Sequence, residues 1–316
     1  MKWLANTRTA LLDPHEIDLR DSAYCIPCFA DLAPLVKSID SVGILNPPLL
    51  QELPGGRMIP VLGRRRLQAA AQLGISQTEV KIVSDRISEA EGFAVALWDN
   101  FGHRTFDIAS TAVVVRRLLD LFPRDVVAGD FLNLLGVPAR GPRLERLRAI
   151  GGLEEPVLQA LALGRIQEKT AFVLSALASD EQHTLMKLTD ALGMNANKRA
   201  EVISHLADLS VFHGKPILEF LHVEEARSIV HDEDIPRPER AARFRRLIRS
   251  WKFPELVNSE QEFQEWLRGL PESERIVVRP APGFESRECT VEIRTESREE
   301  VERILNRLTD GAAEVL

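Results

Sequence analysis

The chain has 316 residues, of which 45% are hydrophobic and 28% are charged, as in an ordinary globular protein of two or three domains. Its net charge of −7 excludes a uniformly basic nucleic-acid binder, although one local basic face is enough for phosphate contact. No apolar run reaches the roughly 20 residues that span a bilayer. Residues 1–8 also lack the apolar core of a secretory signal. We therefore expect a cytoplasmic protein without a membrane partner.

Strand and helix signals alternate over the first 105 residues. Asp31 can cap a helix that continues to Gly43, whose conformational freedom suits a left-handed cap. Strands are predicted over 49–53, 58–62 and 80–83, and helices over 64–73 and 88–100. This alternation predicts a small mixed N-terminal domain, residues 1–105.

Strand signals vanish after Thr105, and short breaks at Gly and Pro separate a series of helical patterns. Their ranges are 107–122, 125–135, 142–150, 154–163, 168–178, 180–192, 196–209 and 216–230. Because the connections are short, we expect a compact all-helical domain over 106–230.

The last part of the chain begins with a linker and a basic helix, residues 231–258. A helix (259–268), two strands (275–279 and 289–294) and a helix (297–309) follow. Ser297 and Glu300 have the spacing of a capping box for that final helix. We therefore predict a small α+β domain over 259–316.

The cysteines offer a weak chemical signal. Cys25 and Cys28 have the spacing of a redox pair or of half a metal site, and Cys289 stands alone. A zinc site would need a second pair of ligands, and no pair of histidines at ligand spacing accompanies them. The interpretation that the spacing is incidental is therefore the commoner one.

A stronger signal is Gly63 followed by three arginines, Arg64, Arg65 and Arg66, between a predicted strand and a predicted helix. Free N–H groups at a helix start and adjacent guanidinium groups favour an anion, above all a phosphate chain. Taken alone, three arginines at a helix start are more often a solvated face.

The stretch 39–83 resembles the N-terminal domain of the ParB/RepB/Spo0J family of DNA partition proteins. The matching residues are Gly43, Leu45, Pro47, Gly63, Arg65, Arg66, Ala69 and Ala70. Asn46 replaces a family Gln, Arg64 replaces Glu, and Gln68 replaces Arg. The resemblance implies an α+β protein with a ParB/sulfiredoxin-like N-terminal domain and a helix-turn-helix middle domain.

A second family segment, E-N-L-Q-R, corresponds to the stretch 99–104, which begins with Asp99 and Asn100. In the family these segments bind CTP and Mg²⁺, and the nucleotide closes a dimeric clamp on DNA. Carried over, the resemblance assigns phosphate contacts to 63–66, the metal to Asp99 and Asn100, and neighbouring positions to Gly43 and Asn46. The departures at Arg64, Gln68, Gly102 and His103 leave hydrolysis, base choice and nucleotide binding open.

Residues 131–150 have the outline of a helix-turn-helix, with Pro142 at the first position of the second helix. That helix and its entry carry four arginines, which are candidate DNA contacts: Arg140, Arg143, Arg146 and Arg148. A helical hairpin with a solvated basic face is the alternative. Residues 147–171 also resemble, more loosely, the stretch that follows the ParB helix-turn-helix.

These observations favour a ParB-like protein of chromosome or plasmid segregation. The resemblance implies double-stranded DNA as a partner, a homodimer, a ParA-type ATPase and association with the nucleoid. The alternative is a transcription or plasmid-copy regulator that binds DNA without a nucleotide switch. An enzyme-first interpretation is disfavoured beyond a slow CTPase, because the phosphate-loop motif has no Cys and the chain has no clustered carboxylates for two-metal chemistry.

Overall fold

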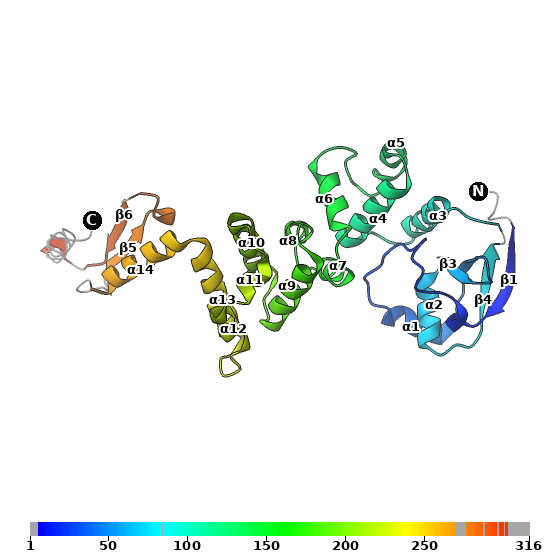
Figure 1. Ribbon diagram of the computed structural model, residues 1–316, viewed down its shortest axis with the longest axis horizontal. Coiled ribbons are helices and arrows are strands. Elements are labelled where there is room, and N and C mark those ends of the chain that lie inside the picture. Colours follow the sequence, from blue (N-terminus) through cyan, green and yellow to red (C-terminus); the bar gives the residue numbers. More distant parts are fainter. Residues whose placement is uncertain are drawn as a thin grey trace. The chain divides into compact units, whose positions relative to one another are not determined.

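A computed structural model describes residues 6–83, 85–269, 276–286, 288–295, 297–299 and 301–302 (Figure 1). Contacts between Cα atoms divide the chain into two compact units. The first contains Met1–Thr189 and Asn195–Ile203, and the second contains Asp190–Met194 and Ser204–Leu316. The predicted α+β class is confirmed, because the chain has an N-terminal sheet with helices, a helical middle and a small C-terminal sheet.

The N-terminal sheet has four strands in the order β1-β4-β2-β3. Their bounds are β1 Thr7–Leu12, β2 Leu49–Glu52, β3 Met58–Leu62 and β4 Thr78–Val83. β2 runs parallel to β4, whereas the β1–β4 and β2–β3 pairs are antiparallel. The sheet is therefore mixed, and its edge strand β1 is largely exposed.

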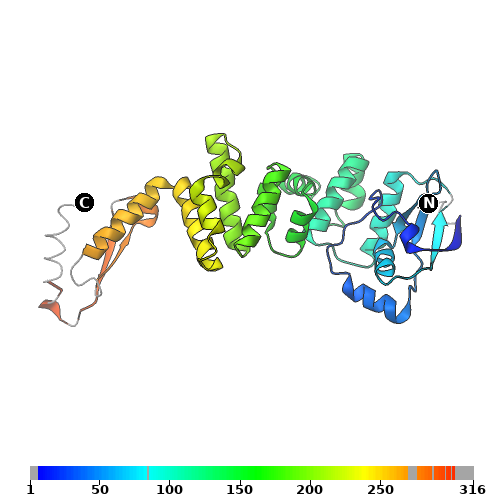
Figure 2. The same cartoon turned by 60° about the horizontal axis from the view of Figure 1, so that its bottom comes forward.

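Alternate residues of this sheet enter two separate cores, as the period of a strand requires. One core holds Leu49 with Tyr24 and Val95, and the other holds Leu50 with Leu67 and Ile82. The helices near the sheet are α1 Ala33–Val42, α2 Arg64–Gln72 and α3 Glu89–Phe101 (Figure 2). Ser88 and Glu91 form the capping box of α3.

A series of short helices completes the first unit. They are α4 Ile108–Leu121, α5 Arg124–Val126, the π-helical turn Val127–Phe131, α6 Pro142–Ile150, α7 Glu155–Ala162, α8 Glu168–Leu174 and most of α9 Ser179–Ala191. Before α6 the chain turns at Gly136 (φ 64°), where the Val137 N–H donates to Leu132 O and the Gly136 N–H donates to Asn133 O. This pair of bonds has the pattern of a Schellman cap and closes the turn over 132–136. The single helix expected over 125–135 is therefore instead a short α-helix and a π-helical turn that end at Phe131, followed by this turn.

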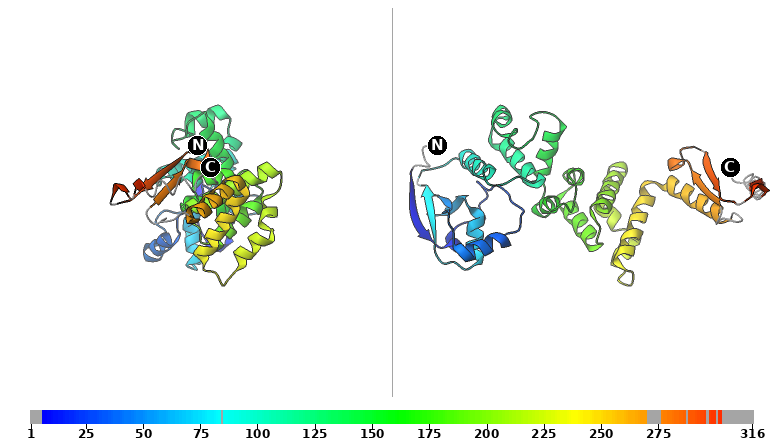
Figure 3. Two further views of the ribbon diagram at one scale, coloured as in Figure 1. Left: turned by 90° about the vertical axis from the view of Figure 1, so that its left-hand side faces the viewer. Right: turned by 180° about the vertical axis from the view of Figure 1, so that it is seen from behind.

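The second unit contains a series of helices and a two-stranded sheet (Figure 3). Its elements are the end of α10 Ala196–His213, α11 Ile217–Leu221, α12 Glu224–His231, α13 Arg237–Lys252, α14 Pro254–Gly269, β5 Ile276–Pro280 and β6 Cys289–Ile293. β5 and β6 pair antiparallel. Most of the helix expected over 297–309, with Glu300 of its capping box, lies outside the described residues. In the part of the chain that is described, no helix is long and apolar enough to cross a membrane.

Other sequence expectations also differ from the structure. β1 was not predicted, because an exposed edge strand lacks the apolar alternation that marks a buried one. The helix expected over 216–230 is two helices, because Val223 adopts an extended conformation (ψ 136°) between them. Gly43 has φ 73° and ψ −171°, so it ends α1 in a glycine-specific conformation other than the left-handed helical one.

Gly92 of α3 allows the helix to press against the buried ring of Tyr24. A Cβ on Gly92 would lie 2.3 Å from Tyr24 Cε1. We therefore expect Gly92→Ala to lower the free energy of unfolding by about 1–3 kcal/mol through overpacking, measured by denaturant unfolding.

Gly102→Ala is the matched control, because its Cβ would lie 3.6 Å from its nearest neighbour, Asp99 O, and its φ is −73°. It should change stability by no more than about 0.5 kcal/mol. Equal stability of the two variants would contradict the packing of Tyr24 on Gly92.

Candidate nucleotide pocket and basic helix

The three consecutive arginines at the start of α2 point to different partners. Arg64 and Arg65 bond to the irregular segment 19–31, whereas Arg66 reaches the turn that follows α1. Gly63, the N-cap of α2, has φ 82°, and a Cβ there would lie 2.8 Å from Arg66 Nη2. Glycine at this position therefore permits both the turn and the path of the Arg66 side chain.

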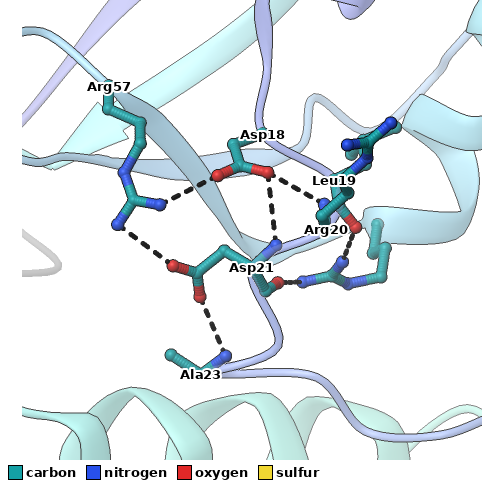
Figure 4. Close-up of polar contacts among 7 residues, drawn as sticks. Asp18, Leu19, Arg20, Asp21, Ala23 and Arg57 are labelled. Atoms are coloured by element: carbon teal, nitrogen blue, oxygen red, sulfur yellow. Dashed lines mark hydrogen bonds and ion pairs between the residues drawn. The ribbon is translucent and has the colours of Figure 1, made fainter.

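Arg64 holds the first part of the irregular segment. Its two terminal nitrogens donate to the carbonyls of Leu19 and Asp21. Arg57 bonds Asp18 at 2.9 Å and Asp21 at 3.3 Å in the same turn (Figure 4). The main-chain N–H of Arg20 lowers the pKa of Asp18, and Arg57 lowers it further. Arg64, which replaces a family Glu, is thus bonded to the backbone of this turn.

Three further arginines hold the rest of the segment. Arg65 donates to Cys28 Sγ and to the carbonyls of Ala30 and Asp31. Arg104, after α3, donates to Pro27 O at 2.6 Å and to Ile26 O at 3.5 Å. Arg117 of α4 donates to Ala23 O at 3.1 Å. We call residues 19–31, held by Arg64, Arg65, Arg104 and Arg117, the arginine-held loop.

Arg66 faces a pocket of about 630 Å³. It is lined by residues of α1, the turn after it, the end of β3, the start of α2 and the end of α3: Leu35, Ser38, Ile39, Val42, Gly43, Ile44, Leu45, Asn46, Pro47, Leu62, Arg66, Asp99 and His103. Four sequence-predicted site residues, Gly43, Asn46, Arg66 and Asp99, therefore lie around one cavity. Gly63, Arg64, Arg65 and Asn100 are not among its lining residues.

Charge in the pocket comes from Arg66 on one element and Asp99 on another. Arg66 Nη1 donates to Asn46 O, which joins the α2 start to the turn after α1. Burial lowers the pKa of Arg66, and the negative charge of Asp99 opposes that shift. An arginine stays protonated in proteins, so the pocket presents a partly desolvated cation to any anion that enters.

The two candidate metal ligands differ in orientation. Asp99 lines the pocket, with its side chain 38% exposed and 3.7 Å from His103 Nε2. Asn100 instead donates to Ala96 O at 2.7 Å and accepts from Arg104 Nε at 2.8 Å. Among the described residues no group of three His, Cys, Asp or Glu could hold a metal. One carboxylate still fits Mg²⁺, which often takes one or two carboxylates and completes its shell with water and substrate phosphates.

Sequence reasoning missed the apolar wall that α1 contributes and the place of the exposed His103 among the lining residues. The amphipathic pattern of α1 was visible, but a pattern does not show that one edge of its apolar face stays open beside Arg66. Val42 and Leu45 remain 58% and 77% exposed at this wall.

α6 is the candidate recognition helix, and its core side carries Leu144, Leu147 and Ile150. Arg140, Arg143 and Arg148 are exposed and form no ion pair among the described residues. Arg146 lies 3.6 Å from Glu168 and its guanidinium packs on the ring of Phe172 at 5.5 Å. Arg140 and Arg143 thus lie at the N-terminal end of α6, whereas Arg146 contacts Glu168 and Phe172 of α8.

The basic helix α13 uses most of its charges within the second unit. Arg237 and Arg240 donate to the carbonyls of Asp190, Ala191 and Val230. Three more form ion pairs at 2.5–2.7 Å: Arg243 with Glu239, Arg249 with Glu260 and Lys252 with Asp208. The number of α13 cations left for solvent or for DNA is therefore smaller than the number of arginines implies.

Comparison with known proteins finds a family that this part of the sequence matches. Residues 29–101 match the model of the ParB N-terminal domain. The nucleoid occlusion protein of Geobacillus thermodenitrificans (strain NG80-2) is 26% identical over 166 residues. That match covers 52% of this chain and 57% of the relative, so the similarity spans little more than half of each.

Three solved structures are also similar. C-terminally truncated ParB of Caulobacter crescentus complexed with CTP-gamma-S is 18% identical over 54% of this chain and 94% of that chain, with a TM-score of 0.26. The same truncated protein complexed to the centromeric parS site is 16% identical over 60% and 96%, with a TM-score of 0.30. A Pnob8-like ParB-N domain is 13% identical over 78% and 98%, with a TM-score of 0.36.

The position of Arg64 predicts a structural effect. Arg64→Ala removes two charge-assisted bonds to the carbonyls of Leu19 and Asp21. We expect the free energy of unfolding to fall by about 1.5–3 kcal/mol, measured by denaturant unfolding.

Arg20→Ala, in the same turn, is the control, because the exposed Arg20 side chain forms no ion pair among the described residues. Its effect should stay within about 0.5 kcal/mol. An Arg64 variant as stable as the Arg20 variant would show that these bonds do not hold the loop.

Proposed function

We propose that this protein is a ParB-like DNA-binding protein of the segregation type, and that the pocket beside Arg66 binds a nucleoside triphosphate, CTP, with Mg²⁺. The observation that carries the proposal is the pocket of about 630 Å³ within the ParB N-terminal domain, lined by Gly43, Asn46, Arg66 and Asp99. Each of these four positions was singled out by the family motifs.

The chemistry of the pocket suits a triphosphate. Arg66 offers a guanidinium that can bind two phosphate oxygens, and it lies in the first turn of α2. The free main-chain N–H groups of that turn also attract an anion. Gly43, with φ 73°, allows the backbone of the turn after α1 to come close to a ligand. The apolar wall of α1, including Leu35 and Ile39, gives a base or ribose a surface to pack against.

Asp99 would hold Mg²⁺ in the pocket, and the metal would neutralise phosphate charge there. Asn100 would act indirectly, because its amide holds Arg104 rather than facing the pocket. Gly63, Arg64 and Arg65 would shape the phosphate side of the site through the α2 turn and the arginine-held loop.

For DNA, we propose that α6 enters the major groove with Arg140 and Arg143 near its leading end, and that Arg148 reaches the phosphate backbone. Arg146 contributes less directly, because it is paired with Glu168. The curated relative is a nucleoid occlusion protein, so association with the nucleoid is the expected location. A homodimer and a ParA-type ATPase partner follow from the same family resemblance.

A regulator without a nucleotide switch is the second candidate. The observation in its favour is that Asn100, the family amide of the metal segment, is bonded to Ala96 and Arg104. Such a protein would bind DNA through α6 equally well, and its response to CTP would be absent.

Isothermal titration with CTP and Mg²⁺ separates these candidates. We expect saturable binding to the full chain, and at least about tenfold weaker binding by Arg66→Ala, because a charge-assisted contact of roughly 1.5–3 kcal/mol is lost. Arg8→Ala is the matched control, because Arg8 pairs with Glu52 on the surface, away from the lining residues. Absence of heat at millimolar CTP in the unmodified chain would remove the nucleotide switch and leave the regulator.

DNA binding is tested by capturing bound genomic fragments from cells and sequencing them. We expect one or a few broad peaks for a sliding clamp and many narrow promoter peaks for a regulator. Arg143→Ala should lose enrichment in both cases. On a bound fragment, the affinity of Arg148→Ala should depend less steeply on salt, with the log–log slope reduced by about 1. Arg243→Ala, which removes a cation paired with Glu239 on α13, should keep both properties.

A further inference from the structure

The arginine-held loop contains Cys25 and Cys28, whose spacing the proposed function does not use. We propose that these two cysteines are a reversible oxidation site: they form a disulfide by exchange with a low-molecular-weight disulfide such as oxidised glutathione, and the bridge releases the loop from Arg65 and Arg104. Release of the loop follows from the contacts described above, and the effect of this release on the pocket rests on the proposed function.

Cys28 is the thiol placed to react first. Arg65 Nη1 contacts Cys28 Sγ, so a fixed positive charge lies against the sulfur that becomes negative when it attacks. Both cysteines are partly accessible. Burial raises the pKa of Cys25, which makes it a weaker initial nucleophile and suits it to the second, resolving step.

The bridge competes with the contacts of Arg104. Residues 25–28 contain neither a helix nor a turn in the reduced structure. Two cysteines can be joined only when their Cα atoms come within about 7 Å. Because only Ile26 and Pro27 separate Cys25 from Cys28, a disulfide between them requires the chain to turn at these two residues. The carbonyls of these two residues are the ones that Arg104 holds. Formation of the turn therefore removes bonds that join the loop to the end of α3.

The exchange is balanced in two steps. The Cys28 thiolate attacks one sulfur of oxidised glutathione, the S–S bond breaks, and one glutathione leaves as a thiolate that takes up a proton. Cys25 then loses its proton to solvent and attacks Cys28 Sγ, which expels the second glutathione. In total two protein thiols are oxidised by two electrons, and one glutathione disulfide is reduced to two thiols.

Release of the loop would affect the pocket through residues that are adjacent in sequence to two of its lining residues. Arg65 precedes Arg66, which lines the pocket, and Arg104 is bonded to Asn100, which follows Asp99. Loss of the loop contacts would free both arginines and loosen the two sides of the pocket that carry its charge.

The test uses the full chain with Cys289→Ser, so that the exposed third thiol cannot interfere. After incubation with oxidised glutathione, alkylation and peptide mass spectrometry should show a Cys25–Cys28 bridge that dithiothreitol removes. With Cys25→Ser the reaction should stop at glutathione on Cys28. With Cys28→Ser, modification of Cys25 should be at least about tenfold slower, since burial disfavours its thiolate. Amide hydrogen exchange of residues 19–31 should rise in the bridged form.

Free thiols at both positions after incubation would overturn the proposal, and so would equal rates of modification in the Cys25→Ser and Cys28→Ser variants. Bridge formation without faster exchange over 19–31 would overturn the release of the loop. Titration of CTP with the reduced and bridged forms separates the two proposals: thiol exchange as described with no CTP binding in either form contradicts only the nucleotide function.

Discussion

The contact on which the N-terminal domain depends is the bond between arginine side chains and the main-chain carbonyls of residues 19–31. Carbonyls outside helices and sheets need other donors when water is excluded. A guanidinium carries five donors in a planar fork, so one arginine can hold two or three carbonyls at once. Arg64 and Arg65 of α2 and Arg104 of the α3–α4 connection each hold two carbonyls, and Arg117 of α4 holds one.

This constraint divides the roles of the basic motif. Arg64 and Arg65 are used by the backbone of the loop, and Arg66 is the arginine of the three that lines the pocket. The positive charge of Arg64, which replaces a family Glu, therefore lies beside the carbonyls of Leu19 and Asp21 and not among the residues that line the pocket. The same division appears at the end of α3, where Asp99 lines the pocket and Asn100 holds Arg104.

The sequence predicted much of the fold, because buried strands and capped helices leave local patterns. The strands at 49–53, 58–62 and 80–83 and the capping box at Ser88 are observed with small shifts of their ends. β1 could not be found in this way, since the pairing of Thr7 with Val83 joins residues far apart in sequence and leaves one edge exposed.

The site was predictable in part for the same reason. Motifs identified Gly43, Asn46, Arg66 and Asp99, which line one pocket. The direction of Arg64 was beyond sequence reasoning, because its carbonyl partners lie 43 and 45 positions away. On α13 the pattern showed a row of cations but not their partners, such as Glu260 for Arg249.

The central claim is that the pocket between the turn after α1, the start of α2 and the end of α3 receives CTP and Mg²⁺. Amide hydrogen exchange with and without this ligand measures it directly, because a bound nucleotide protects the backbone that it contacts. We predict slower exchange over residues 43–47 and 63–66 and no change in α13. Unchanged exchange in both pocket segments at saturating CTP and Mg²⁺ would contradict the account.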